Sequence, residues 1–286
     1  MKLRLLHRRA LWLALAASLV ATGAQAHDTW LSPVKPPTAG QDTVLDISTG
    51  NRYPTQEFGA TLESIDKSAC VDGQGRSVAL RPTQATEKWT QFRARPASPA
   101  QGLACWVEIR PFEIELQPNL IEVYLAEIRA SAALRATWAD LASRKLPWLE
   151  SFRKFARIEL AENRLLTAEQ RVALRKPAGL ALELVLLGTQ PVAVGEELEF
   201  QVLRDGQPLP GFQVELQTAQ SPLGIWRETD AQGKLRHRLP FAGRWLLRGT
   251  DLRLAPRDPT RWESRFVTLA LDVKPAQSPP AGTGKP

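Results

Sequence analysis

The chain has 286 residues, with 37 Lys and Arg against 30 Asp and Glu and a formal net charge of +7. Four of the basic residues and none of the acidic ones lie in the first 26 positions, so the other 260 residues carry a net charge of only +3. That balance gives no reason to expect nucleic acid as a partner, and the length suffices for two domains with their own cores.

The first 26 residues have the three parts of a secretory signal peptide. A basic start through Arg9 is followed by an uncharged apolar run over residues 10–21, and then by Ala24 and Ala26 at the −3 and −1 positions of a cleavage site. The apolar run is shorter than the roughly 20 residues of a membrane span. We therefore expect cleavage after Ala26 and a periplasmic protein with no transmembrane segment.

The cysteine count is consistent with this location. Cys70 and Cys105 are the only two cysteines in the sequence. An isolated pair in an oxidising compartment favours a disulfide over two buried thiols. On the chain-entropy estimate, the closed loop would stabilise the fold by about 4 kcal/mol, less any strain.

Residues 27–117 are expected to form an N-terminal β lobe. Short segments alternate between apolar and polar residues, and Pro- and Gly-rich turns separate them, which is typical of a sandwich. These segments are Thr43 to Ile47, Phe58 to Ile65, Lys88 to Phe92 and Cys105 to Ile109.

Residues 118–178 are expected to form a helical insert. The apolar residues from Leu120 to Leu141 recur at helical spacing, and Pro147 ends that pattern. Trp148, Phe152, Phe155 and Ile158 then predict a second helix. Two basic clusters, Arg153, Lys154 and Arg157 and then Arg171, Arg175 and Lys176, are interpreted as solvated helix faces. Thr167 to Gln170 could cap a further short helix.

Residues 179–274 contain about seven short strands and are expected to form an immunoglobulin-like sandwich able to fold alone. The Pro- and Gly-rich tail, residues 275–286, is expected to be disordered. The predicted fold class is mainly β with a helical insert, in two β-sandwich-like lobes of which the C-terminal one is immunoglobulin-like.

His27 would be the first residue after cleavage, and its free α-amine and imidazole could then chelate one metal ion. Candidates for the further ligands are Asp28, His237, Asp251 and Glu263. Imidazole suits nickel, copper and zinc, and Cu²⁺ binds such a site most tightly among divalent ions. The alternative is that a terminal His, or a lone His on a strand, has no metal role.

Enzyme signatures are missing from the sequence. After cleavage two histidines remain, so a Ser-His-Asp triad would have to use His27 or His237. The motifs G-x-S-x-G, H-E-x-x-H and C-x-x-C do not occur. No catalytic residue and no organic cofactor is predicted.

Several motifs resemble an uncharacterised family of exported proteins, whose members are often labelled nickel-uptake transporter, CbiK-like periplasmic component. The similar segments are Ala26 to Leu31 (an AH-x-x-W-L entry), Pro111 to Leu116, Phe152 to Arg157, Thr229 to Lys234, Gly243 to Arg248 and Trp262 to Ser264. The resemblance implies two β-rich lobes around a helical insert. It is also the only reason to expect nickel as the metal. Many relatives carry a His where this chain has Asp251, so Asp251 would have to replace that ligand.

Three functions follow as expectations. The first is a metal-binding or metal-delivery protein that works beside a nickel or cobalt uptake system, with a membrane metal transporter as partner. The second is a non-enzymatic interaction module whose immunoglobulin-like lobe binds a membrane protein or carbohydrate. The third is a copper-dependent oxidase that pairs His27 with His237.

Overall fold

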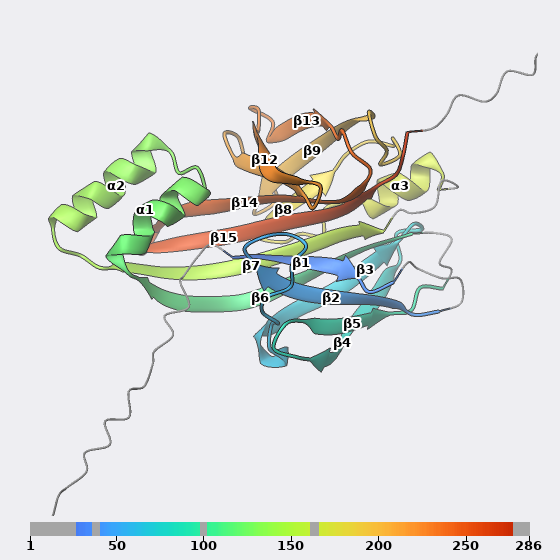
Figure 1. Ribbon diagram of the computed structural model, residues 1–286, viewed down its shortest axis with the longest axis horizontal. Helices are drawn as coiled ribbons and strands as arrows, with labels where there is room; N and C mark the ends of the chain where they lie inside the picture. The colour runs from blue at the N-terminus through green and yellow to red at the C-terminus, as the bar shows by residue number, and fades with distance from the viewer. Residues whose placement is uncertain (1–26, 36–40, 98–101, 161–165, 277–286) are drawn as a thin grey trace, which may run out of the picture.

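The computed structural model describes residues 27–35, 41–97, 102–160 and 166–276, and the predicted signal peptide and most of the predicted disordered tail lie outside these ranges. The fold is mainly β with a helical insert, as the sequence predicted (Figure 1). Among the described residues, no helix is long and apolar enough to cross a membrane.

The strands of the first half are β1 (Asp28–Pro33), β2 (Thr43–Gly50), β3 (Ile65–Asp72), β4 (Ser77–Ala85), β5 (Thr90–Ala94) and β6 (Leu103–Leu116), and the 3-10 turn η1 (Leu62–Ser64) precedes β3. The helical insert holds α1 (Pro118–Glu127), α2 (Ala132–Ser143) and α3 (Ala168–Leu174), with β7 (Trp148–Leu160) between α2 and α3. The C-terminal strands are β8 (Leu182–Leu186), β9 (Glu197–Arg204), β10 (Gln207–Pro208), β11 (Gln213–Thr218), β12 (Ser221–Glu228), β13 (Lys234–Arg238), β14 (Gly243–Ala255) and β15 (Asp258–Val273).

One eleven-stranded sheet runs through both expected lobes, in the order β1-β2-β5-β4-β3-β6-β7-β15-β14-β11-β12. It curls, so that β1 at its edge returns to lie against β7 and β15, where the Thr268 hydroxyl donates to the Thr29 carbonyl at 2.6 Å. A smaller sheet of β8, β9, β10 and β13 packs on its C-terminal half. The two lobes are therefore joined by continuous backbone pairing.

β7 corrects the prediction of a second helix over Trp148 to Ile158. The segment is a strand that pairs with β6 on one side and, in parallel, with β15 on the other. Both of its faces are covered from Phe155 onward: Phe155 packs into the C-terminal core, and Ala156 and Ile158 pack into the N-terminal core. A strand buried on both faces loses its alternation, so a subset of its apolar residues also fits a helical period.

A bulge in β6 keeps one face of this central region continuous. The register of β6 against β7 shifts between Ile109 and Phe112, at the position of Pro111. An inserted residue reverses which side chains face each side of a strand. Ile109 before the bulge and Phe112 after it therefore face the same side, together with the even-numbered residues of β7.

The helices lie at opposite ends of the long strands, with α1 and α2 at one end and α3 at the other (Figure 1). Arg129, with φ of 50°, and the N-cap Ser131 separate α1 from α2, where a single helical pattern was expected. The capping prediction for α3 is confirmed, because Thr167 and Gln170 form a reciprocal capping box. The α1–α2 pair packs on Trp148 and Trp262, whose rings stack at 4.5 Å.

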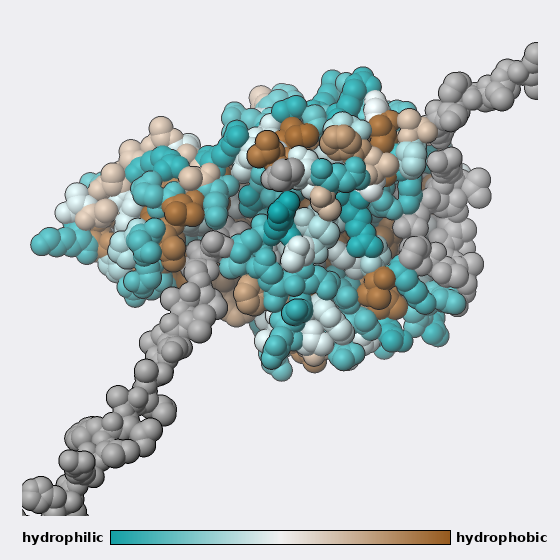
Figure 2. All heavy atoms as spheres, viewed as in Figure 1, coloured by the Kyte–Doolittle hydropathy of each residue, from teal (hydrophilic) through white to brown (hydrophobic). Residues whose placement is uncertain are grey.

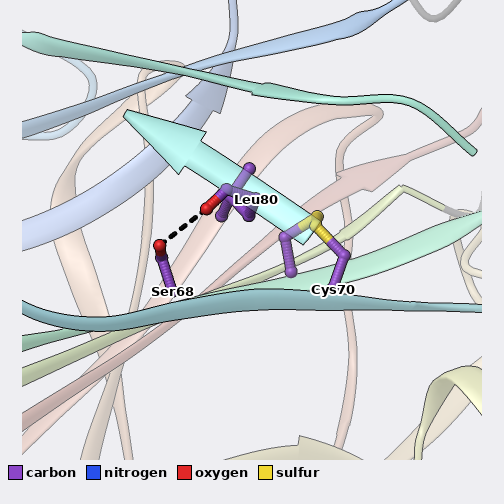
Figure 3. The surroundings of a disulfide bond; sticks show 4 residues. Ser68, Cys70 and Leu80 are labelled. Carbon is purple, nitrogen blue, oxygen red and sulfur yellow. Dashed lines mark hydrogen bonds between the residues drawn. A yellow bond between two sulfur atoms is a disulfide. The ribbon is translucent and has the colours of Figure 1, made fainter. Parts of the chain in front are cut away.

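The predicted disulfide is confirmed. Cys70 on β3 and Cys105 on β6 are direct cross-strand partners, and both are fully buried in the N-terminal core. Next to them, the Ser68 hydroxyl donates to the Leu80 carbonyl at 2.7 Å, which ties β3 to β4 (Figure 3).

The segment from Phe58 to Ile65 was expected to be a strand, and that expectation is wrong up to Ser64, because β3 begins only at Ile65. It makes a single bridge, between Phe58 and Thr49, and then the turn η1, which Thr61 caps by accepting from the Ser64 amide. The local hydrogen bond of the threonine competes with pairing to a neighbouring strand. This segment forms one wall of the pocket described below.

The interpretation of two basic clusters as solvated faces is also wrong in part. Arg157 is buried and pairs with Glu183 at 2.6 Å, and Arg175 is buried and pairs with Glu159 at 3.1 Å. The face shown in Figure 2 is mostly hydrophilic, with small separate apolar patches, one of them over the helical region.

Candidate functional site

A pocket of about 580 Å³ opens between the helical end of the molecule and the curled N-terminal half of the large sheet. Its floor is formed by neighbouring strands: Ile109, Phe112, Ile114 and Leu116 from β6, Glu150, Phe152 and Lys154 from β7, and Phe266 from β15. Its walls come from β1, β2, the Phe58 to Ser64 segment and Tyr124 of α1. A mostly apolar pocket of this size with few polar groups is typical of small-molecule sites.

Two aromatic side chains at this pocket are unusually exposed. Phe58 is 44% exposed and Phe112 is 43% exposed, although both are large and apolar. Phe112 stacks on Phe152 at 5.6 Å, so the exposed ring continues the apolar floor. Exposed apolar surface around a cavity is typical of a ligand-binding or partner-binding site.

Lys154 supplies the positive charge of the pocket. Its Nζ donates to the His27 carbonyl at 2.8 Å and lies 5.5 Å and 5.7 Å from the ring centroids of Phe152 and Phe266. Burial lowers the pKa of Lys154 from its ordinary 10.5 to about 8, and the nearby Asp28 carboxylate acts in the opposite direction. The amine is thus held in surroundings that hydrate it poorly.

Glu150 lies further along the same face of β7 and is satisfied by hydrogen bonds. Tyr124 Oη donates to its Oε1 at 3.0 Å, Trp148 Nε1 donates to its Oε2 at 2.7 Å, and the Ser264 hydroxyl also donates to Oε1. Burial raises the pKa of Glu150, and these three hydrogen bonds partly oppose that shift. The side chain therefore anchors α1 to β7 and β15.

His27 lies at the edge of this pocket. Its Nε2 is 3.8 Å from Glu57 Oε2, and its ring meets Phe58 edge-on at 5.3 Å between centroids. The position of β1 across β7 places it there. Glu57 was not among the ligands expected from the sequence.

Asp28 is buried beside His27 and points to a different partner. Its Oδ2 pairs with Arg248 Nη1 at 3.0 Å, and Arg248 also pairs with Glu215. Burial raises the pKa of Asp28 to about 6, although Arg248 and Lys154 both lower it. This carboxylate therefore shares its arginine with Glu215.

The other three expected metal ligands are held by arginines as well. Asp251 pairs with Arg204 at 3.1 Å, and Glu263 pairs with Arg253 at 3.3 Å. His237, on β13 of the smaller sheet, has its Nδ1 3.3 Å from Arg227 Nη2. In the part of the chain that the structure describes, no three His, Cys, Asp or Glu side chains form a group that could hold a metal ion.

The structure thus brings His27 to a pocket without the ligands expected beside it. The lining residues Lys154, Phe112 and Phe152 were not predicted as site residues, because the sequence pattern around Lys154 was interpreted as a helix. In an alternating strand, Arg153 and Arg157 point to one face and Lys154 points to the other. This separation of Lys154 from the two arginines was the signal available in the sequence.

Comparison with protein families gives one result. Residues 135–250 match the domain of unknown function DUF4198. This agrees with the expected uncharacterised family and gives no support to the nickel-uptake label, and no curated protein matches the chain. The DUF4198 segment includes β7, so Glu150, Phe152 and Lys154 of the pocket floor belong to it.

Proposed function

We propose that the protein is an exported, non-enzymatic binding protein that takes a small apolar molecule into the pocket above β6, β7 and β15. The observation that carries the proposal is the 580 Å³ space lined by Phe112, Ile114, Phe152 and Phe266. Filling it removes exposed aromatic surface from water, at roughly 25 cal/mol for each Å² buried. Export rests on the signal-like first 26 residues.

A fluorescence titration with the neutral dye Nile red tests this binding. Ile114 faces the pocket from β6, and a tryptophan there would fill space that a ligand needs. Wild type should bind the dye saturably, and Ile114→Trp should weaken binding at least tenfold.

Val123 on α1 provides a matched control, because it is exposed and does not line the pocket. Val123→Trp should bind Nile red like wild type. An Ile114→Trp protein with an unchanged circular dichroism spectrum and unchanged dye affinity would place the binding elsewhere and contradict the proposal.

Metal binding at the mature terminus is the second candidate, and the position of His27 beside Glu57 favours it. After cleavage, the α-amine and imidazole of His27 and the Glu57 carboxylate would provide three donors. The amine has an unperturbed pKa of about 7.7–8.0, so a metal ion can displace its proton near neutral pH. The positive charge of Lys154 next to the His27 carbonyl opposes a cation here.

Calorimetry with Ni²⁺ and Cu²⁺ on three proteins separates this candidate from the first. The authentic His27 terminus should bind at least tenfold more tightly than a one-residue extension or His27→Ala, because extension converts the amine to an amide. Glu57→Gln should weaken binding less. Equal affinities for the three termini would remove the terminal chelate.

A further inference from the structure

The Lys154 amine is an incompletely paired cation inside the apolar pocket. It has three N–H donors, and one of them goes to the His27 carbonyl. Asp28 is the acid whose charge acts on the pKa of Lys154, and its carboxylate pairs with Arg248 at 3.0 Å. Among the described residues, no carboxylate forms an ion pair with Lys154.

The residues paired with Lys154 on the two neighbouring strands carry no charge. Phe266 of β15 and Ile109 of β6 are its direct cross-strand neighbours, and both are apolar. Glu150 lies four residues along β7, or about 13 Å at the rise of an extended strand. The hydrogen bonds from Tyr124, Trp148 and Ser264 already engage both oxygens of Glu150.

Lys154 lies at one end of the pocket, and apolar side chains provide most of the lining beyond it. Glu150 also faces the floor there, where three hydrogen bonds hold it. From Lys154 the pocket continues over Phe152 and Ile114 toward Leu116 below α1. A ligand with one anionic group and a linear hydrocarbon part matches this order. A single amine with two donors that no described residue accepts suits a carboxylate, whereas phosphate groups are usually held by several donors or a bidentate arginine.

We propose that the pocket selects linear apolar carboxylates, with the carboxylate paired to Lys154 and the hydrocarbon chain lying over Phe152 toward Leu116. The inference rests on the proposed binding function and adds the chemical class of the ligand. An ion pair in this poorly hydrated place contributes more than one on the surface, because the cation has already lost part of its hydration in the free protein.

Three probes of the same chain length test the proposal: decanoate, decanol and decylamine, each titrated calorimetrically into the full mature chain. Wild type should bind decanoate at least tenfold more tightly than decanol, and decylamine most weakly. Lys154→Met should lose the preference for decanoate while still binding decanol. Lys67→Met is the matched control, because Lys67 is exposed on β3 outside the pocket and should leave all three affinities unchanged.

The outcomes separate this inference from the proposed function. Equal binding of decanoate and decanol by wild type, or tightest binding of decylamine, would overturn the carboxylate assignment and leave the apolar pocket in place. Failure of all three probes, together with failure of Nile red, would overturn both. The comparison of probes on wild type stands even if Lys154→Met does not fold.

Discussion

At the scale of single residues, Lys154 should lower the free energy of unfolding of the unliganded protein. Its lowered pKa of about 8 means that the native state holds the charged form at a disadvantage. Lys154→Met should therefore stabilise the protein at pH 7 by about 1–3 kcal/mol, measured by urea denaturation. A residue that lowers the stability of the unliganded protein is typical of a binding site.

The pH dependence of that difference has a definite sign. Between pH 8 and 10.5 the unfolded state binds more protons at Lys154 than the native state, so the wild-type free energy of unfolding rises with pH there. The advantage of Lys154→Met should be largest below pH 8 and should shrink by pH 10. An equal advantage at pH 7 and pH 10 would mean that the effect comes from packing. Lys67→Met should cost less than about 1 kcal/mol at both values, because Arg153 still pairs with Glu108 at 2.6 Å.

At the scale of elements, the disulfide joins neighbouring strands of the N-terminal core. Replacing both Cys70 and Cys105 by Ala should lower the free energy of unfolding by about 2–4 kcal/mol, because the bond closes a loop with a sequence separation of 35. Denaturation of wild type with and without reductant provides the comparison. A double variant as stable as the oxidised wild type would show that strain offsets the loop closure.

β7 changes what is expected of the C-terminal lobe as a fragment. Residues 179–274 alone would leave β15 without its parallel partner and Glu183 buried without Arg157. We expect this fragment to lack a cooperative thermal transition by circular dichroism, in contrast to the expectation from its strand content. A sharp transition near that of the full chain would show that the smaller sheet and β11 to β15 are sufficient.

Some elements of the fold could be predicted from the sequence, and the pocket could not. Alternation in Thr43 to Ile47, the lone cysteine pair and the Thr167 cap are local or compositional signals, and the structure agrees with each. The prediction for β7 was wrong because burial on both faces of a strand removes the alternation of apolar and polar residues. The pocket could not be predicted, because β1, β6, β7, β15 and α1 bring its lining together only when the sheet curls.

At the scale of the whole molecule, Arg248 links the first strand to the C-terminal lobe. It pairs with Asp28 of β1 and Glu215 of β11, and both carboxylates are buried. Arg248→Met should cost roughly 3 kcal/mol at pH 8, because it leaves two buried acids without a cation. The loss should be smaller at pH 5, since the pKa of Asp28 is about 6 and its carboxyl is then mostly protonated.

The exposed pair Arg135–Glu122 provides the control for that prediction. Arg135→Met should cost less than about 1 kcal/mol at either pH. If Arg248→Met lowered the free energy of unfolding no more than Arg135→Met, the ion pairs of Arg248 between β1 and the C-terminal lobe would not stabilise the fold.

The most direct test of the binding pocket is a crystal structure of residues 27–286 grown with decanoate. Electron density for decanoate should run along β7 between Phe112, Phe152 and Phe266, with the carboxylate within hydrogen-bonding distance of Lys154 Nζ. Density for the ligand at another site, with this pocket holding only water, would contradict the proposed binding mode.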